Sequence, residues 1–204
     1  INSLVKESAG LRDRIIFENV PSSHQFLTKL IQAIRDNRKV RVTYKGYTMG
    51  KEMTYELEPY FIREFKRRWY LYAHKDYDKD HEPHMYALDS MSEMEVLAET
   101  FEIPKSIDAE EWFSPLYGVR KYSDMKPKRV LLKVSSVQTK YFRSLPLHRS
   151  QEEVETHEDY SIFSYFLTTD YDIKHDVLSF GKEVEVLEPL SFRRTIAETV
   201  IHLS

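Results

Sequence analysis

The chain has no cysteine among its 204 residues and only five glycines. Without thiols it cannot form disulfides, thiolate zinc sites, iron–sulfur clusters or a cysteine nucleophile. The small number of glycines leaves few positions for the loops that cradle phosphates in many nucleotide-binding enzymes. The absence of cysteine also fits a reducing compartment, so we expect a cytoplasmic protein.

Long apolar runs and a secretory leader are also missing. The apolar runs are far shorter than the ~18 residues of a membrane span, and we expect no membrane contact. A hydrophobic content of 41%, with 13% aromatic residues, excludes intrinsic disorder. The net charge of -3 argues against a broad surface for nucleic acid. It leaves room for a local pocket that binds a few phosphates.

Hydrophobic periodicity divides the chain into three parts and predicts an α+β fold. Residues 1–38 form a connector and a helix. Residues 39–125 carry several short strands at close spacing and a linker, which suggests a small antiparallel β-barrel or a curled sheet. Residues 126–204 follow the order strand, helix, strand, strand, helix, strand. That order is typical of a ferredoxin-like unit.

Three local predictions follow from capping and turn residues. Ser22 or Ser23 caps the first helix, which we expect to run to about Arg38. Asp108 caps a short helix. The stretch 117–127 contains a glycine, lysines and an aspartate, so we interpret it as a linker between the second and third parts.

Motifs of common enzyme classes are absent. The sequence has no G-x-G-x-x-G, P-loop, G-x-S-x-G or H-E-x-x-H pattern. The nearest approach to a metal site is His81 and His84 in an acidic loop with Asp78 and Asp80, but Pro83 lies between the histidines. A solvated loop is the favoured interpretation. We therefore expect a non-enzymatic protein without metal or cofactor.

A basic and aromatic cluster is more informative. The run from Arg63 to Arg68 leads directly into Trp69 and Tyr70. Basic groups beside aromatic rings on a small barrel can neutralise phosphates and stack on bases. The alternative is a charged hairpin tip followed by a core strand, which the residues favour because aromatic strand residues are usually buried. Alternation places Trp69 and Leu71 on one face of that strand.

The stretch from Leu30 to Leu97 resembles the WYL domain of bacterial transcriptional regulators, which takes its name from a Trp-Tyr-Leu run. Here that run is Trp69 to Leu71. The pieces that support the resemblance are Ala33-Ile34, Val40 to Tyr44, Pro59 to Phe61 and Ala87 to Asp89. The segments that resemble the WCX-type extension found after WYL domains are Leu145 to His148, Ser150-Gln151, Leu178 to Gly181 and Val184 to Pro189.

The resemblance implies a complete set of expectations. The WYL part would be an Sm-like or SH3-like barrel that senses a ligand, often a nucleotide or single-stranded nucleic acid. The extension would be a ferredoxin-like unit that helps to form a homodimer. Duplex DNA would be bound by an N-terminal helix-turn-helix that this chain lacks, and Ile1 in place of Met fits such a truncation. Residues 15–19 resemble the connector to that domain.

The candidate ligand-binding residues come from the cluster and from the resemblance. They are Tyr44, Arg63, Arg67, Arg68, Trp69, Tyr70 and Tyr86. Two positions depart from the family pattern, because Ser90 and Tyr55 stand where many members have arginine. Loss of a bidentate donor weakens anion recognition. A structural module for oligomerisation and protein interaction, with a degenerate pocket, is therefore the alternative hypothesis. A metal-dependent hydrolase using His81 and His84 is a third and weaker one.

Overall fold

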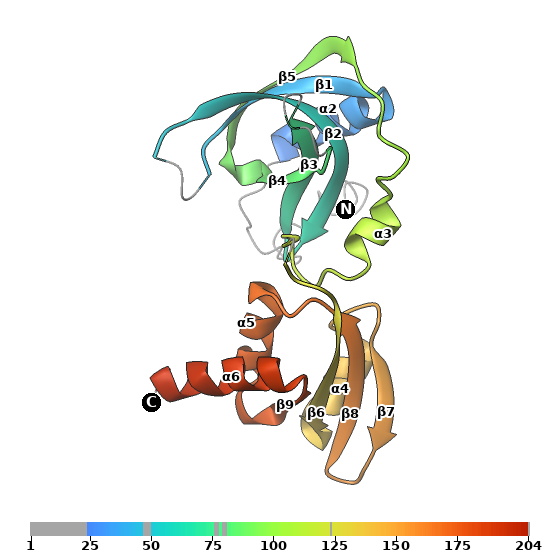
Figure 1. Cartoon of the computed structure of the whole chain (residues 1–204), viewed down its shortest axis with the longest axis vertical. Helices are drawn as coiled ribbons and strands as arrows, with labels where there is room; N and C mark the ends of the chain where they lie inside the picture. The colour runs from blue at the N-terminus through green and yellow to red at the C-terminus, as the bar shows by residue number, and fades with distance from the viewer. Residues whose placement is uncertain (1–23, 47–49, 76–77, 79–80, 123, 204) are drawn as a thin grey trace, which may run out of the picture.

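The structure is a computed structural model that describes residues 24–46, 50–75, 78, 81–122 and 124–203. It consists of two units, each built on its own antiparallel sheet with its own helices (Figure 1). The chain passes between them once, through the segment that follows a short helix beside the first sheet (Figure 1). The α+β class predicted from the sequence is therefore confirmed.

The first unit is a five-stranded sheet packed against one helix. In chain order its elements are α2 (His24–Arg35), β1 (Arg38–Tyr44), β2 (Met53–Phe65), β3 (Arg68–Lys75), β4 (His84–Ala87) and β5 (Met91–Thr100). The strand order is β4-β3-β2-β1-β5. Among the described residues no pairing joins β4 to β5, so the sheet is curled but not closed into a barrel.

The first helix is shorter than predicted. It ends at Arg35 rather than near Arg38. Asn37 adopts a left-handed φ of 47°, which reverses the chain, and Arg38 already pairs with Thr100. The Arg38 Nε also donates to the Leu97 carbonyl at 2.6 Å. The predicted cap, Ser22 or Ser23, lies outside the described residues.

The core of this unit lies between α2 and one face of the sheet. Leu30 and Ala33 on α2 are fully buried against Val40, Leu57 and Leu71. Their burial follows from the apolar stripe of the helix and the alternation along β1. Each fully buried leucine contributes about 1.5–3 kcal/mol relative to exposure.

The opposite face of β3 is buried as well. It is covered by α3 (Ala109–Phe113), whose Phe113 ring meets the Tyr72 ring edge-on at 4.8 Å. Asp108 caps this helix by accepting from the Glu111 amide at 2.9 Å, as predicted. Because both faces of β3 are covered, every residue in the centre of the strand is aromatic or apolar, with no polar residue between them. The predicted alternation is present, since Trp69 and Leu71 pack in the core beside α2 while Tyr70 and Tyr72 pack on the other face.

The second unit is a four-stranded sheet with three helices. Its elements are β6 (Lys128–Ser135), α4 (Ser136–Ser144), β7 (Glu152–Thr156), β8 (Tyr160–Leu167), α5 (Tyr171–Ser179), β9 (Val184–Glu188) and α6 (Leu190–Leu203). The strand order is β7-β8-β6-β9, with all neighbours antiparallel. Val130, Leu132 and Val134 alternate toward the helices and share one core with Phe142 and Phe192.

The first residues of the predicted linker are packed rather than exposed. Tyr117 is only 5% exposed and belongs to the core of the second unit. The Tyr72 hydroxyl donates to the Val119 carbonyl at 2.6 Å, and the Thr168 amide donates to the Pro115 carbonyl at 2.9 Å. This stretch is therefore a structural joint between the two units. Its polar composition concealed the packing role of Tyr117.

Candidate functional site

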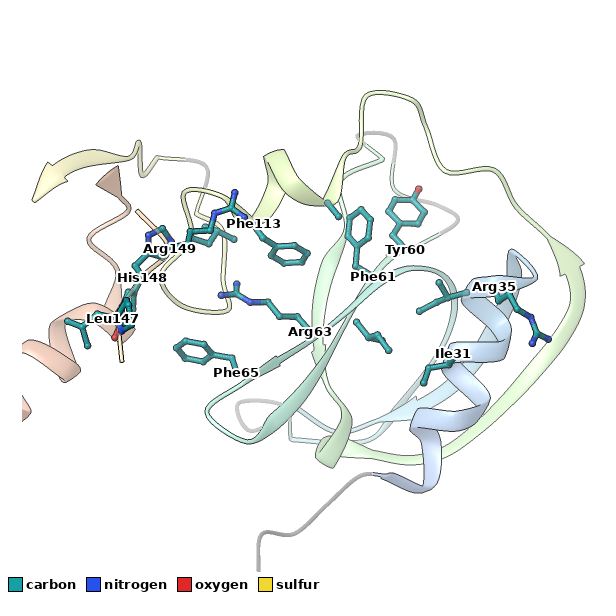
Figure 2. A pocket seen from close by; sticks show the side chains of 16 residues that line it. Ile31, Arg35, Tyr60, Phe61, Arg63, Phe65, Phe113, Leu147, His148 and Arg149 are labelled. Carbon is teal, nitrogen blue, oxygen red and sulfur yellow. The ribbon is translucent and has the colours of Figure 1, made fainter. Parts of the chain in front are cut away.

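A large cavity lies where the two units meet. Its volume is about 890 Å³. Its walls come from α2, β2 and α3 of the first unit and from residues 146–149 of the second (Figure 2). Ligand-binding cavities in proteins are typically about 300–1,000 Å³. This one can hold a molecule the size of a nucleotide.

Most of the cavity wall is apolar. Phe61 and Phe65 come from β2 and Phe113 comes from α3. Ile31, which is 50% exposed, lines the cavity on the side of α2. Leu147 lines the cavity from the second unit. An apolar cavity with a few polar groups is the usual composition of a small-molecule site.

Arg63 supplies the central positive charge. Figure 2 shows its guanidinium between Phe113 and Phe65, directed toward the side of the cavity that carries His148 and Arg149. The guanidinium carbon lies 5.1 Å from the Phe113 ring centre and 5.5 Å from that of Phe65. Nη1 donates to the Gly118 carbonyl at 2.8 Å. Among the described residues Arg63 has no carboxylate partner, so its charge is available to an anion.

Three further polar side chains border the cavity. His148 is 9% exposed, and burial, assisted by Arg149 and Arg63, lowers its pKa. Its Nδ1 lies 2.8 Å from the Ser150 hydroxyl. Arg149 pairs with Glu110 at the rim. Arg35 pairs with Asp36 at 2.8 Å and points away from the cavity (Figure 2).

An aromatic group of the predicted residues lies on the other face of the sheet. Tyr44 and Tyr86 meet edge-on with ring centres 5.3 Å apart, and Tyr55 lies 6.0 Å from Tyr86. Trp69 is half-buried against the same core. These side chains do not line the cavity at the junction.

The remaining predicted residues surround the β2–β3 hairpin. Tyr70 is buried and lies directly opposite Arg63 across the two strands. Arg68 donates through Nε to Asp89 at 2.8 Å, and Arg67 occupies the turn with a left-handed φ of 64°. The seven candidates therefore do not converge on one site. Arg63 alone lines the cavity, with Tyr70 beside it.

Several cavity residues were not among the sequence candidates. They are Ile31, Phe113, Leu147, His148 and Arg149. The segment that holds the last three carries the resemblance to the extension. Nothing in that resemblance places it opposite a strand more than eighty residues earlier in the chain.

The two units are also held together beside the cavity. Asp176 on α5 accepts from the Tyr117 hydroxyl and pairs with Lys66 Nζ at 2.6 Å. Burial and the Asp176 carboxylate raise the pKa of Tyr117, so the phenol stays protonated and donates. The hairpin tip of the first unit is thereby tied to α5 of the second.

The acidic loop shows no converging metal ligands. His84 Nε2 lies 2.9 Å from Asp78 Oδ2, and the His81 ring lies 5.0 Å from that of His74. Across the residues with described positions, no group of three or more histidine, aspartate or glutamate side chains could hold a metal ion. Asp80 lies outside that set. Within it, no helix has the length and apolar character needed to cross a membrane.

Comparisons with known proteins identify two family domains in the chain. The family profile of the WYL domain matches residues 25–96, and that of the WCX domain matches residues 126–202. The chain is 28% identical over 185 residues to the uncharacterised HTH-type transcriptional regulator YobV of Bacillus subtilis (strain 168). The match covers 86% of this chain and 53% of YobV, so the chain spans about half the length of that relative.

Two solved structures are similar at 14% identity. A CRISPR Cas-related protein superposes with a TM-score of 0.53, covering 88% of this chain and 51% of that one, which shows a shared fold. Proteasome accessory factor B/C (PafBC) of Arthrobacter aurescens superposes with a TM-score of 0.43, over 95% and 30% of the two chains. The chain thus carries a WYL domain at residues 25–96, followed by a WCX domain at residues 126–202.

Proposed function

We propose that this chain is the ligand-sensing, non-enzymatic portion of a cytoplasmic bacterial transcriptional regulator. The ligand is a nucleotide or a short single-stranded nucleic acid bound in the cavity between the two units. The observation that carries this proposal is the unpaired charge of Arg63 inside an apolar cavity at the junction. Resemblance to YobV supports the regulatory role.

The position of the cavity suggests how sensing would work. Its walls belong to both units, so an occupant contacts both at once. A ligand shifts a conformational equilibrium only by the difference in its affinity for the two states. Here that difference arises if the ligand binds one relative placement of the units better. Duplex DNA would be bound by a helix-turn-helix outside this chain.

We also propose the fold class of each unit that the family resemblance implies. The curled five-stranded sheet is assigned to the Sm-like or SH3-like class, and the second unit to the ferredoxin-like class. The order β7-β8-β6-β9, with helices after the first and third strands of the unit, supports the latter.

A thermal-shift titration tests ligand binding. Mononucleotides, cyclic nucleotides and short 5′-phosphorylated oligonucleotides are added separately to the purified chain. A ligand at 100 times its Kd should add about 2.7 kcal/mol to the free energy of unfolding. Nucleosides without phosphate are the matched controls, and we expect them to give a much smaller shift. No stabilisation by any phosphorylated ligand would contradict the sensing role.

The buried His148 predicts how binding depends on pH. Burial and the nearby Arg149 and Arg63 lower its pKa, so an anion in the cavity should raise that pKa and binding should take up a proton. By linkage, affinity then rises as pH falls through the pKa of His148 in the complex, and it levels off below the lowered pKa of His148 in the free protein. We expect the Kd of a phosphodiester ligand, whose own charge is constant, to fall several-fold from pH 8 to pH 6.

The matched control is His148→Gln, which removes the titrating group but keeps a polar side chain. Its Kd should be nearly constant over the same range. An equal pH dependence in both proteins would show that another group is responsible.

The alternative function is a structural module whose family pocket has decayed. Arg68 is neutralised by Asp89, and Ser90 stands where the family pattern has arginine. The variant Ser90→Arg discriminates the two hypotheses. If it creates nucleotide binding that the parent lacks, the structural alternative is favoured. If the parent already binds tightly, the alternative fails.

We also propose a homodimer, on family resemblance alone. Light scattering across a range of concentrations should give twice the mass of the chain. A constant monomer mass would contradict dimerisation through these two units.

A further inference from the structure

The indole of Trp112 is an unsatisfied donor in the described structure. Trp112 is 8% exposed, and its Nε1 is buried without a hydrogen-bond partner. A buried polar group without a partner lowers the stability of the fold. Such a group is uncommon in a folded protein, and it calls for a specific explanation such as a ligand.

The same side chain lines a second cavity. This cavity is about 420 Å³ and lies between α3, β4 and the segment that joins the units. Its donors are Arg120, Lys121 and His84, while Glu82 supplies one carboxylate. The cavity therefore brings two cationic side chains, Arg120 and Lys121, to the same wall as Trp112.

Lys121 lies over the face of the Trp112 indole. Its Nζ lies 3.6 Å from the centre of the Trp112 ring system, and its side chain is 40% exposed. Its ion pair with Glu82 is long, at 3.5 Å. Exposed ion pairs of this kind contribute little to stability, so a stronger anionic partner can displace Glu82.

We propose that this cavity binds a compact oxyanion, of the class of phosphate monoesters and small dicarboxylates. Arg120 and Lys121 would supply its charge-assisted contacts, and Trp112 Nε1 would donate to one of its oxygens. Hydrogen bonds to charged groups are stronger than those between neutral groups, and the ligand would also satisfy the buried N–H group.

This site is separate from the cavity at the junction. Trp112 lines the smaller cavity, while its neighbour Phe113 lines the larger one, so α3 stands between them. The smaller cavity contains neither Arg63 nor His148. Its occupancy is therefore a property independent of the proposed nucleotide site.

Indole ¹H–¹⁵N spectra of the full chain provide the test, because the sequence has only two tryptophans. The variant Trp112→Phe assigns the two Nε1–H signals. Titration uses glycerol phosphate and, in a second arm, succinate, with glycerol and sodium chloride of equal ionic strength as controls. We expect one or both anions to shift the Trp112 signal saturably and downfield, while the Trp69 signal stays in place.

Variants then locate the binding. Arg120→Ala and Lys121→Ala should each weaken the Kd about tenfold or more, whereas Arg149→Ala at the other cavity and the exposed Arg129→Ala should leave it unchanged. The proposal is overturned if the Trp112 signal does not move with either anion. It is also overturned if both indole signals move alike or if Arg120→Ala and Lys121→Ala have no effect. If Arg149→Ala loses nucleotide binding, its affinity for the oxyanion should still be unchanged. The experiment therefore distinguishes failure of the oxyanion site from failure of the proposed nucleotide site.

Discussion

Replacing Gly118 with alanine is expected to destabilise the joint between the two units by about 1–3 kcal/mol, the usual cost of overpacking a well-packed interior. A Cβ atom at this position would lie 1.9 Å from Asp172 Oδ2 and 2.8 Å from Asp172 Cβ. Because the Asp172 Cβ is close to the α5 backbone, rotation of the carboxylate alone does not relieve the clash. The Val119 amide, which donates to Asp172 at 3.3 Å, would lose its partner.

Urea unfolding of the whole chain measures this effect, with fluorescence and circular dichroism followed together. Gly50→Ala is the matched control, because a Cβ there meets nothing within 4 Å. We expect the control to change the free energy of unfolding by less than about 0.5 kcal/mol, as for other surface substitutions. Equal effects of the two substitutions would contradict the packing described at the joint.

Arg63→Ala is expected to weaken nucleotide binding by about 10- to 150-fold, which corresponds to 1.5–3 kcal/mol for hydrogen bonds to a charged group. Arg63 is the cation inside the cavity that has no carboxylate partner in the described structure. Its guanidinium is also fixed between two aromatic rings, which limits the entropy lost when a ligand binds.

Isothermal titration calorimetry with a nucleotide identified by thermal shift measures the loss. Arg63→Lys keeps the charge but removes the planar donor group, so an intermediate Kd is expected. Arg41 lies on β1 with its side chain 45% exposed and pairs with Glu56 and Glu95, so Arg41→Ala provides the control variant. If Arg63→Ala and Arg41→Ala bind alike, the cavity does not recognise the ligand through Arg63.

Much of the fold could be predicted because local patterns determine it. The period-two alternation of Val130, Leu132 and Val134 and the cap at Asp108 depend on nearby residues alone. The end of the first helix was misjudged, because Asn37 leaves the helical region and Arg38 pairs with a strand sixty residues away. Long-range pairing of this kind has no local signal.

The candidate site was harder to predict, because its residues come together through long-range packing that has no local signal in the sequence. Arg63 was found because its basic and aromatic neighbours are contiguous in the chain. Alternation could not show that Tyr86 and Trp69 face the core while Arg63 faces the second unit. His148 lies 85 residues beyond Arg63, and the packing of the two units against each other brings both residues to one cavity.

Photoaffinity labelling with an azidoadenosine monophosphate and an azido-tagged trinucleotide, followed by peptide mass spectrometry, tests the location of the sensing site directly. We predict crosslinks both within residues 60–65 of β2 and within residues 146–149 of the second unit, and competition by the unmodified nucleotides. Labelling confined to the face that carries Tyr44 and Tyr86, or no competed labelling with either probe, would contradict a ligand site between the two units.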